Sequence, residues 1–201
     1  MASTMIHLML AYEIYPNACG SYFVGSFAPD VFHKNRSDTR LAKNKNHFRD
    51  VPDMEAALTE FYSQIDRDNP FHEGYFVHLI CDMWWYEDID KLVESNPCKQ
   101  GWYDNLKNEY RTAGVWIRRN MPWGDDIFNR MSLCSDNFES PMPDPTNEEI
   151  VNYKNGLLSP SRRIKDNEVE GEPSAVFTPE FLESYSNSIA KKYKSWVKDI
   201  A

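Results

Sequence analysis

The sequence predicts an all-α protein with a single domain that spans residues 1–201. Runs of alternating β-branched residues, which are typical of strands, are absent from it. Apolar residues instead recur at helical spacing, and prolines and N-capping residues divide the chain into segments of helical length. A length of 201 residues with 41% hydrophobic residues suits one domain with a substantial core.

The first half of the chain is expected to hold three helices. The first covers residues 5–15. Residues 16–50 are expected to be irregular, because they contain glycines, prolines and a polar run. Asp53 is an N-cap for a helix over residues 54–66, and a proline opens a long helix over residues 70–95.

Four further helices are expected in the second half, separated by proline-rich or polar loops. Thr146 and Glu149 form a capping-box pattern at the start of the third of them, and Thr178 caps the last. The expected helices cover residues 101–119, 124–133, 147–157 and 179–198, with loops over 135–145 and 159–175.

The acidic charge of the chain narrows the range of partners. A formal net charge of -9 argues against binding to a nucleic-acid duplex, whose backbone is also negative. A small phosphate-containing substrate stays compatible with it, because a bound metal ion can invert the local field.

The opening segment and the cysteines favour a cytoplasmic protein. The first residues lack a basic region and a cleavage site, and His7 interrupts their short apolar run, so neither a signal peptide nor a membrane span is expected. No disulfide is expected, and Cys81 is expected to be a buried free thiol. The four cysteines match no CxxC pattern: Cys19, Cys81, Cys98 and Cys134.

The strongest chemical pattern lies in the long helix over residues 70–95. His78 and Asp82 are four residues apart, so both project from one face of it. Their apolar neighbours indicate a buried helix, where an ionised aspartate is costly unless it is paired or binds a metal ion. An Asp–His hydrogen bond in the core explains this pair as well as a metal site does.

Three further fragments supply candidate ligands. His7 lies on an otherwise apolar helix, Asp30 ends the segment over residues 25–30, and His47 follows a polar stretch. Taken singly, each has an ordinary explanation: a core histidine, a common turn and a surface histidine.

Together, these fragments resemble the zinc-dependent phospholipase C-like family, in particular its small cytoplasmic bacterial members. The family pattern is an early helical His, a Gly-Ser-x-x-Pro-Asp turn, a His-Phe pair and a buried Gly-Tyr-x-x-His-x-x-x-Asp helix. All four pieces occur here in that order, at His7, residues 25–30, His47-Phe48 and residues 74–82. The resemblance covers residues 5–90 and implies a multi-helix bundle of the phospholipase C / P1 nuclease type.

The resemblance also implies a divalent metal centre. Asp30, His47, His78 and Asp82 would bind one ion, and His7 would bind a second, with Asp82 bridging. Such ligands suit zinc, with iron or manganese as alternatives. The implied enzyme is a phosphoesterase in which a metal-activated water attacks a phosphate ester or phosphodiester. Asp30 and Asp82 are its catalytic carboxylates, with Asp30 as general base.

The chain departs from the secreted multi-metal phospholipases at two points. Those enzymes carry further histidines and a glutamate after the long helix, whereas no histidine follows His78 here. They also bind metal through a processed N-terminus, which an unprocessed start at Met1 would not supply. We therefore expect one or two metal ions, and a small phosphate-containing molecule rather than a phospholipid as substrate.

Two other classes compete with this interpretation. HD-type phosphohydrolases need an adjacent His-Asp pair, which this sequence lacks. A non-catalytic helical module, with a structural metal or a role in binding a small ligand or partner, stays open.

We expect a surface or structural role for most of the remaining polar and aromatic candidates. Trp84, Trp85 and Tyr86 are expected to form core and pocket wall. The polar candidates are His33, His72 and Asp104 near the metal, and Lys43, Lys45, Arg118 and Arg119 as phosphate contacts.

Overall fold

The computed structural model describes residues 3–32, 39–95, 102–160 and 174–200. All regular structure within these ranges is helical, and they contain no strand. The all-α prediction is therefore confirmed for this part of the chain. None of the described helices is both long enough and apolar enough to cross a membrane.

The helices predicted from sequence occur with nearly the expected bounds, together with three short elements near the N-terminus. In chain order the elements are α1 (Thr4–Ile14), α2 (Gly20–Gly25), the 3-10 helix η1 (Ala28–Asp30), α3 (Thr39–Asn46), α4 (Met54–Gln64), α5 (Pro70–Ser95), α6 (Trp102–Asn120), α7 (Gly124–Leu133), α8 (Asn147–Leu158) and α10 (Pro179–Ile200).

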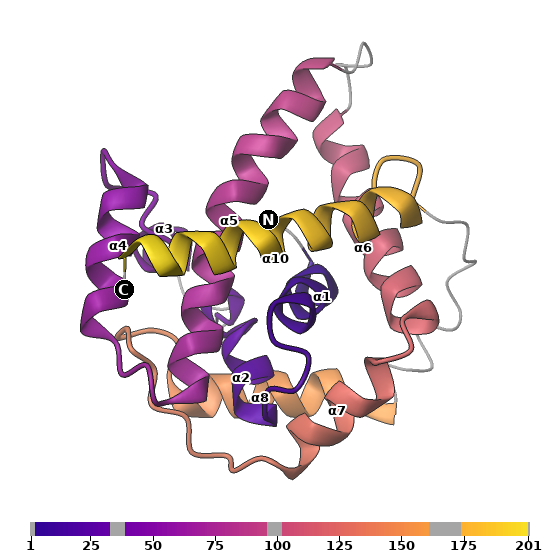
Figure 1. Cartoon of the computed structure of the whole chain (residues 1–201). Coiled ribbons are helices and arrows are strands. Elements are labelled where there is room, and N and C mark those ends of the chain that lie inside the picture. The colour runs from indigo at the N-terminus through magenta and orange to yellow at the C-terminus, as the bar shows by residue number, and fades with distance from the viewer. Residues whose placement is uncertain (1–2, 33–38, 96–101, 161–173, 201) are drawn as a thin grey trace.

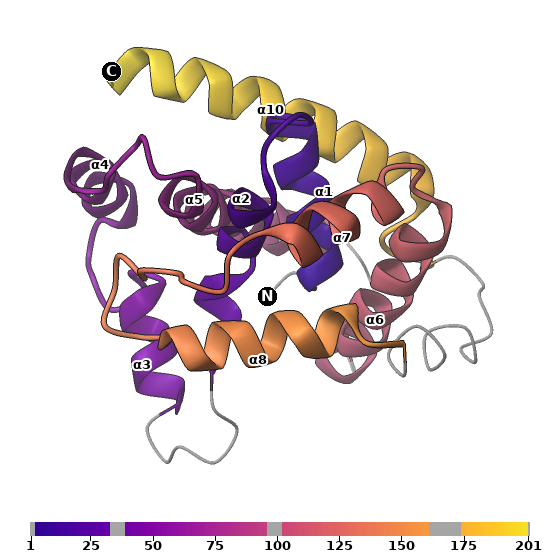
Figure 2. The same ribbon diagram turned by 90° about the horizontal axis from the view of Figure 1, so that it is seen from below.

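Helix α1 is the centre of the molecule. Eight of its eleven residues are buried, among them every residue from Met5 to Ala11, as expected of a helix with neighbours on several sides. It packs against α5, α6 and α10 (Figure 1). Seen from below, α10 covers one side of the central helices and α8 the opposite side (Figure 2). The buried side chain of His7 on α1 therefore faces other protein groups rather than water.

The predicted N-caps form as expected. The Asp53 carboxylate accepts a hydrogen bond from the Ala56 amide over 2.9 Å. Thr146 and Glu149 form the capping box at the start of α8. These caps satisfy amide groups that the first turn of a helix leaves without intrahelical partners.

The expectation of an irregular segment over residues 16–50 is wrong, because α2, η1 and α3 lie there. The glycines of α2 serve close packing rather than turns. A Cβ atom on Gly25 would lie 2.2 Å from the Phe71 carbonyl oxygen, and one on Gly74 of α5 would lie 1.9 Å from the Tyr22 carbonyl oxygen. Their missing side chains let the backbones of α2 and α5 come together.

The loop and cysteine predictions are confirmed where the structure describes them. Residues 135–145 form no helix, and Cys19, Cys81 and Cys134 are free, with Cys81 buried. Cys98 and most of the expected loop over residues 159–175 lie outside the described residues.

Candidate metal centre

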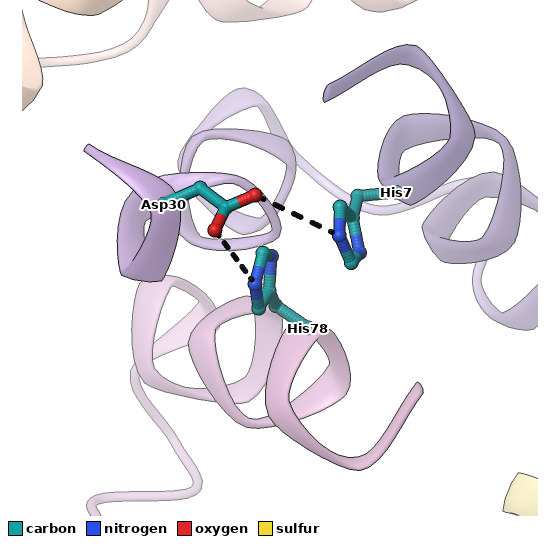
Figure 3. A group of neighbouring side chains, drawn as sticks. All are labelled: His7, Asp30 and His78. Carbon is teal, nitrogen blue, oxygen red and sulfur yellow. Dashed lines mark ion pairs between the residues drawn. The ribbon is translucent and has the colours of Figure 1, made fainter. Parts of the chain in front are cut away.

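The five predicted ligands meet at one place, although they come from four parts of the fold. His7 lies on α1, Asp30 ends η1, His47 follows α3, and His78 and Asp82 lie on α5. His7, Asp30 and His78 point toward one another from three elements (Figure 3). The three histidines and Asp82 are almost fully buried, whereas Asp30 is 13% exposed.

The close contact between α2 and α5 orients the His78 ring. Ser26 follows directly after α2, and its carbonyl oxygen lies 2.8 Å from His78 Nδ1. A carbonyl only accepts hydrogen bonds, so Nδ1 is the protonated nitrogen. The neutral ring therefore presents the lone pair of Nε2 to the cluster.

The C-terminal cap of α3 orients the His47 ring. His47 Nδ1 lies 2.9 Å from the Lys43 carbonyl oxygen, so it is a donor, and Nε2 again faces the cluster. The chain then turns back through Phe48, whose φ is 54°. The Phe48 and Arg49 amides donate to carbonyl oxygens of the last helical turn, a Schellman motif. Glycine is usual at the left-handed position of this motif.

The Nε2 atoms of His47 and His78 lie 3.3 Å apart. Because both rings carry their hydrogen on Nδ1, their neutral forms bring two lone pairs face to face. His47 Nε2 also lies 3.3 Å from Asp30 Oδ1, which is another acceptor. A metal ion or an added proton between these atoms would satisfy the lone pairs that the two histidines present.

The separations suit a metal ion. Two ligand atoms bound about 2.0 Å from a tetrahedral zinc ion lie about 3.3 Å apart. His47 Nε2 has this separation from both His78 Nε2 and Asp30 Oδ1. His78 Nε2 and Asp30 Oδ1 are 3.9 Å apart, which is further than two ligand atoms of a tetrahedral zinc ion lie from each other.

His7 defines a second half of the cluster. Its Nε2 lies 3.9 Å from Asp30 Oδ2 and 3.9 Å from Asp82 Oδ1. Neither ring nitrogen has a hydrogen-bond partner among the described residues. The other carboxylate oxygens, Asp30 Oδ1 and Asp82 Oδ2, face His47 at 3.3 Å and 3.9 Å. Asp30 therefore lies between the two halves of the cluster, a bridging position that the family resemblance implied only for Asp82.

The environment keeps these groups in forms that can bind metal. Burial lowers the pKa of His78 to about 4, and burial followed by repulsion from His78 holds the pKa of His7 well below its usual value. Burial alone would raise the pKa of Asp30, but the close approach of His47 and the surrounding basic groups, Lys43 among them, hold it well below its usual range. His7 and His78 are therefore neutral and Asp30 is ionised at pH 7.

Two basic side chains hold the carboxylates. Lys43 Nζ lies 2.7 Å from Asp30 Oδ1, and Arg49 Nη2 lies 2.6 Å from Asp82 Oδ2. Arg49 also donates to the Tyr86 hydroxyl over 2.9 Å. The sequence pointed to Lys43 only as a minor candidate and missed Arg49. Its place two residues after His47 was the available hint.

The other candidates of the sequence lie elsewhere. His72 Nε2 donates to the Glu139 carbonyl over 2.8 Å, which makes it structural. Arg118 donates to the Leu157 carbonyl, and Lys45 and Arg119 are exposed. Trp84 and Trp85 are core residues, as expected. His33 and the side chain of Asp104 lie outside the described residues.

No known protein family, curated protein or solved structure matches this chain.

Proposed function

We propose that this chain is a metal-dependent hydrolase that cleaves a phosphate ester or phosphodiester with metal-activated water. The observation that carries the proposal is the convergence of two imidazole Nε2 atoms, 3.3 Å apart, beside the Asp30 carboxylate. The order of the four motifs supports a phospholipase C / P1 nuclease type of architecture. A cytoplasmic location stays a prediction from the sequence.

The cluster offers places for one or two divalent ions. His47, His78, Asp30 and Asp82 would hold the first, and His7 with the remaining oxygens of the two aspartates would hold the second. Two groups of candidate ligand atoms lie within 4.8 Å of one another, one of His7, Asp30 and His78 and one of His47, His78 and Asp82, so His78 is common to both. Imidazole and carboxylate ligands favour zinc, with iron or manganese as alternatives.

When bound, the metal would lower the pKa of a water molecule and polarise a phosphoryl oxygen. Asp30 is the ligand with the greatest solvent access and is ionised, so with one ion bound its second oxygen would be the acceptor for the proton of the attacking water. The water oxygen would bond to phosphorus as the ester P–O bond breaks, and Asp30 would return the proton to the departing alcohol. Asp82 is fully buried and holds its place through Arg49.

Activity assays on metal-loaded protein test this proposal. Phosphomonoesters and phosphodiesters should be screened, and any hydrolysis should disappear with a chelator and in His78→Ala, which removes a ligand. His72→Ala is a matched control, because His72 lies on the same helix outside the cluster. Hydrolysis that persists in His78→Ala would contradict a reaction at this site.

The coordination of the metal in the same preparation distinguishes the hydrolase from the non-catalytic alternative, a helical module with a structural metal. A structural metal is held by a full set of protein ligands, whereas a catalytic one keeps a position open for water or substrate. Stoichiometric metal with no open coordination position and no hydrolysis would favour a structural role.

A further inference from the structure

Lys43 and Arg49 place two positive charges beside the candidate ligands. Each approaches a different aspartate, Lys43 at Asp30 and Arg49 at Asp82. The side chains of Lys43 and Arg49 are 16% and 25% exposed, so both are partly accessible to solvent, whereas the three histidines and Asp82 are not.

The charges of the cluster are balanced before any metal binds. The two carboxylates of Asp30 and Asp82 face the two basic side chains of Lys43 and Arg49. A divalent ion adds two positive charges, and the basic groups already offset both carboxylates. A buried excess of positive charge is costly in a low-dielectric site unless an anion compensates it.

One N–H donor of Arg49 has no acceptor among the described residues. Its Nη2 group bonds to Asp82 and Tyr86, and its guanidinium carbon lies 4.5 Å from the centre of the Tyr86 ring, which fixes its plane. Its Nε atom is buried, and nothing in the described part of the chain accepts a hydrogen bond from it. A buried N–H group without a partner costs free energy that an oxyanion would recover.

We infer that Lys43 and Arg49 form, with the loaded metal centre, an oxyanion site that prefers a terminal phosphate dianion to a phosphodiester monoanion. The inference rests on the proposed function and specifies its substrate class. A dianion balances the two charges of one divalent ion, whereas a diester monoanion leaves one uncompensated. Metal binding competes with Lys43 for Asp30 Oδ1, and the released ammonium group then faces the ligand.

Binding of two small probes to the manganese-loaded protein tests this inference. Phosphorus NMR relaxation at about pH 8, above the second pKa of phosphate, reports inorganic phosphate and dimethyl phosphate near the bound ion. We expect at least about tenfold tighter binding of inorganic phosphate, because its second charge is matched. Arg49→Gln and Lys43→Gln should each weaken it by about tenfold or more.

Three further variants serve as controls. Arg40→Gln and Lys45→Gln change exposed basic residues on the same helix, α3, and should bind phosphate as the wild type does. Arg49→Lys keeps the charge but loses the Nε–H donor, so its affinity should fall between the wild type and Arg49→Gln. Arg49→Lys also keeps a positively charged partner for Asp82, so it tests the role of the Nε–H group even if Arg49→Gln does not fold.

The metal content of each sample separates the possible failures. Equal affinity for the two probes, or unchanged phosphate affinity in both Gln variants, overturns the inference while the metal proposal stands. Bound manganese without any phosphate binding also overturns the inference and leaves the metal proposal standing. A wild-type protein that takes up no metal overturns both proposals.

Discussion

At the scale of single residues, two backbone carbonyls determine what the cluster can bind. The Ser26 and Lys43 carbonyl oxygens hold the hydrogens of His78 and His47 on Nδ1. The opposite nitrogens then present their lone pairs to a shared centre, as is usual for metal-binding histidines. A core Asp–His hydrogen bond, the ordinary alternative for His78 and Asp82, does not account for the contact between the two rings.

The buried histidines predict how the stability of metal-free protein depends on pH. The folded-state pKa of His78 is about 4, below the usual 6.5, so between these values the unfolded chain binds more protons. Stability should therefore fall as the pH falls from about 6.5 to about 4, by about 3 kcal/mol for His78. His7 acts in the same direction, and the lowered pKa of Asp30 extends the loss to lower pH.

Urea unfolding of chelator-treated protein at about pH 7 and about pH 5 measures this loss. His78→Asn should weaken the pH dependence, because it removes a group that gains a proton on unfolding. His72→Asn changes a histidine outside the cluster and should leave the dependence in place. Equal stability of the wild type at the two pH values would contradict neutral, buried histidines.

The sequence predicted some of these residues better than others. His78 and Asp82 share a helix, so their spacing alone placed them on one face. Asp30, His47 and His7 lie on other elements, and only their resemblance to a family pattern joined them. The role of Arg49 depends on the left-handed backbone of Phe48, which a phenylalanine does not indicate because glycine is usual there.

At the scale of elements, the contact between α2 and α5 connects packing to the site. Gly74 lies one helical turn before His78, and Gly25 directly precedes Ser26. The two glycines therefore allow the approach that brings the Ser26 carbonyl to His78. A wider spacing of these helices would leave the ring without its partner.

Gly74→Ala tests this connection. A Cβ atom there would lie 1.9 Å from the Tyr22 carbonyl oxygen, a backbone atom that cannot turn away, so the helices must separate. We expect a loss of about 1–3 kcal/mol in the free energy of unfolding and weaker metal binding, measured by denaturation and metal titration.

Gly156→Ala is the matched control for this variant. Gly156 lies on α8, and no atom within 4 Å would meet a new Cβ there. Alanine should stabilise this helix by about 0.5–1 kcal/mol and leave metal binding unchanged. Wild-type stability and metal affinity in Gly74→Ala would contradict the role of the close contact.

Helix prediction succeeded where the sequence carries local start signals. Asp53, Thr146 and Thr178 each begin a helix by accepting an amide hydrogen bond. The short helices α2 and α3 were missed, because α2 lacks an acidic or hydroxyl cap and its glycines suggested turns. Helix α2 packs against α5 and α7, which are distant in sequence, and a local pattern does not reveal such contacts.

At the scale of the whole molecule, the candidate ligands link α1, η1, the end of α3 and α5. A bound ion would therefore connect segments that are distant in sequence, from His7 to Asp82. Because the unfolded chain does not hold these groups together, metal binding should stabilise the folded state.

Thermal unfolding with and without a chelator measures this stabilisation. Free metal about 100-fold above its Kd adds about 2.7 kcal/mol, which corresponds to about 5–10 °C in Tm for a chain of this length. Asp82→Asn should show a smaller shift, because it weakens the centre without changing its volume. A Tm that neither metal nor chelator changes would contradict a specific centre.

Elemental analysis of protein purified without a chelator tests the central claim most directly. We predict about one or two equivalents of zinc, iron or manganese per chain. The metal should be lost in His47→Ala and in His78→Ala and retained in His72→Ala. A wild-type chain that contains no stoichiometric metal, and takes up none of the three on reconstitution, would contradict the metal centre and the function built on it.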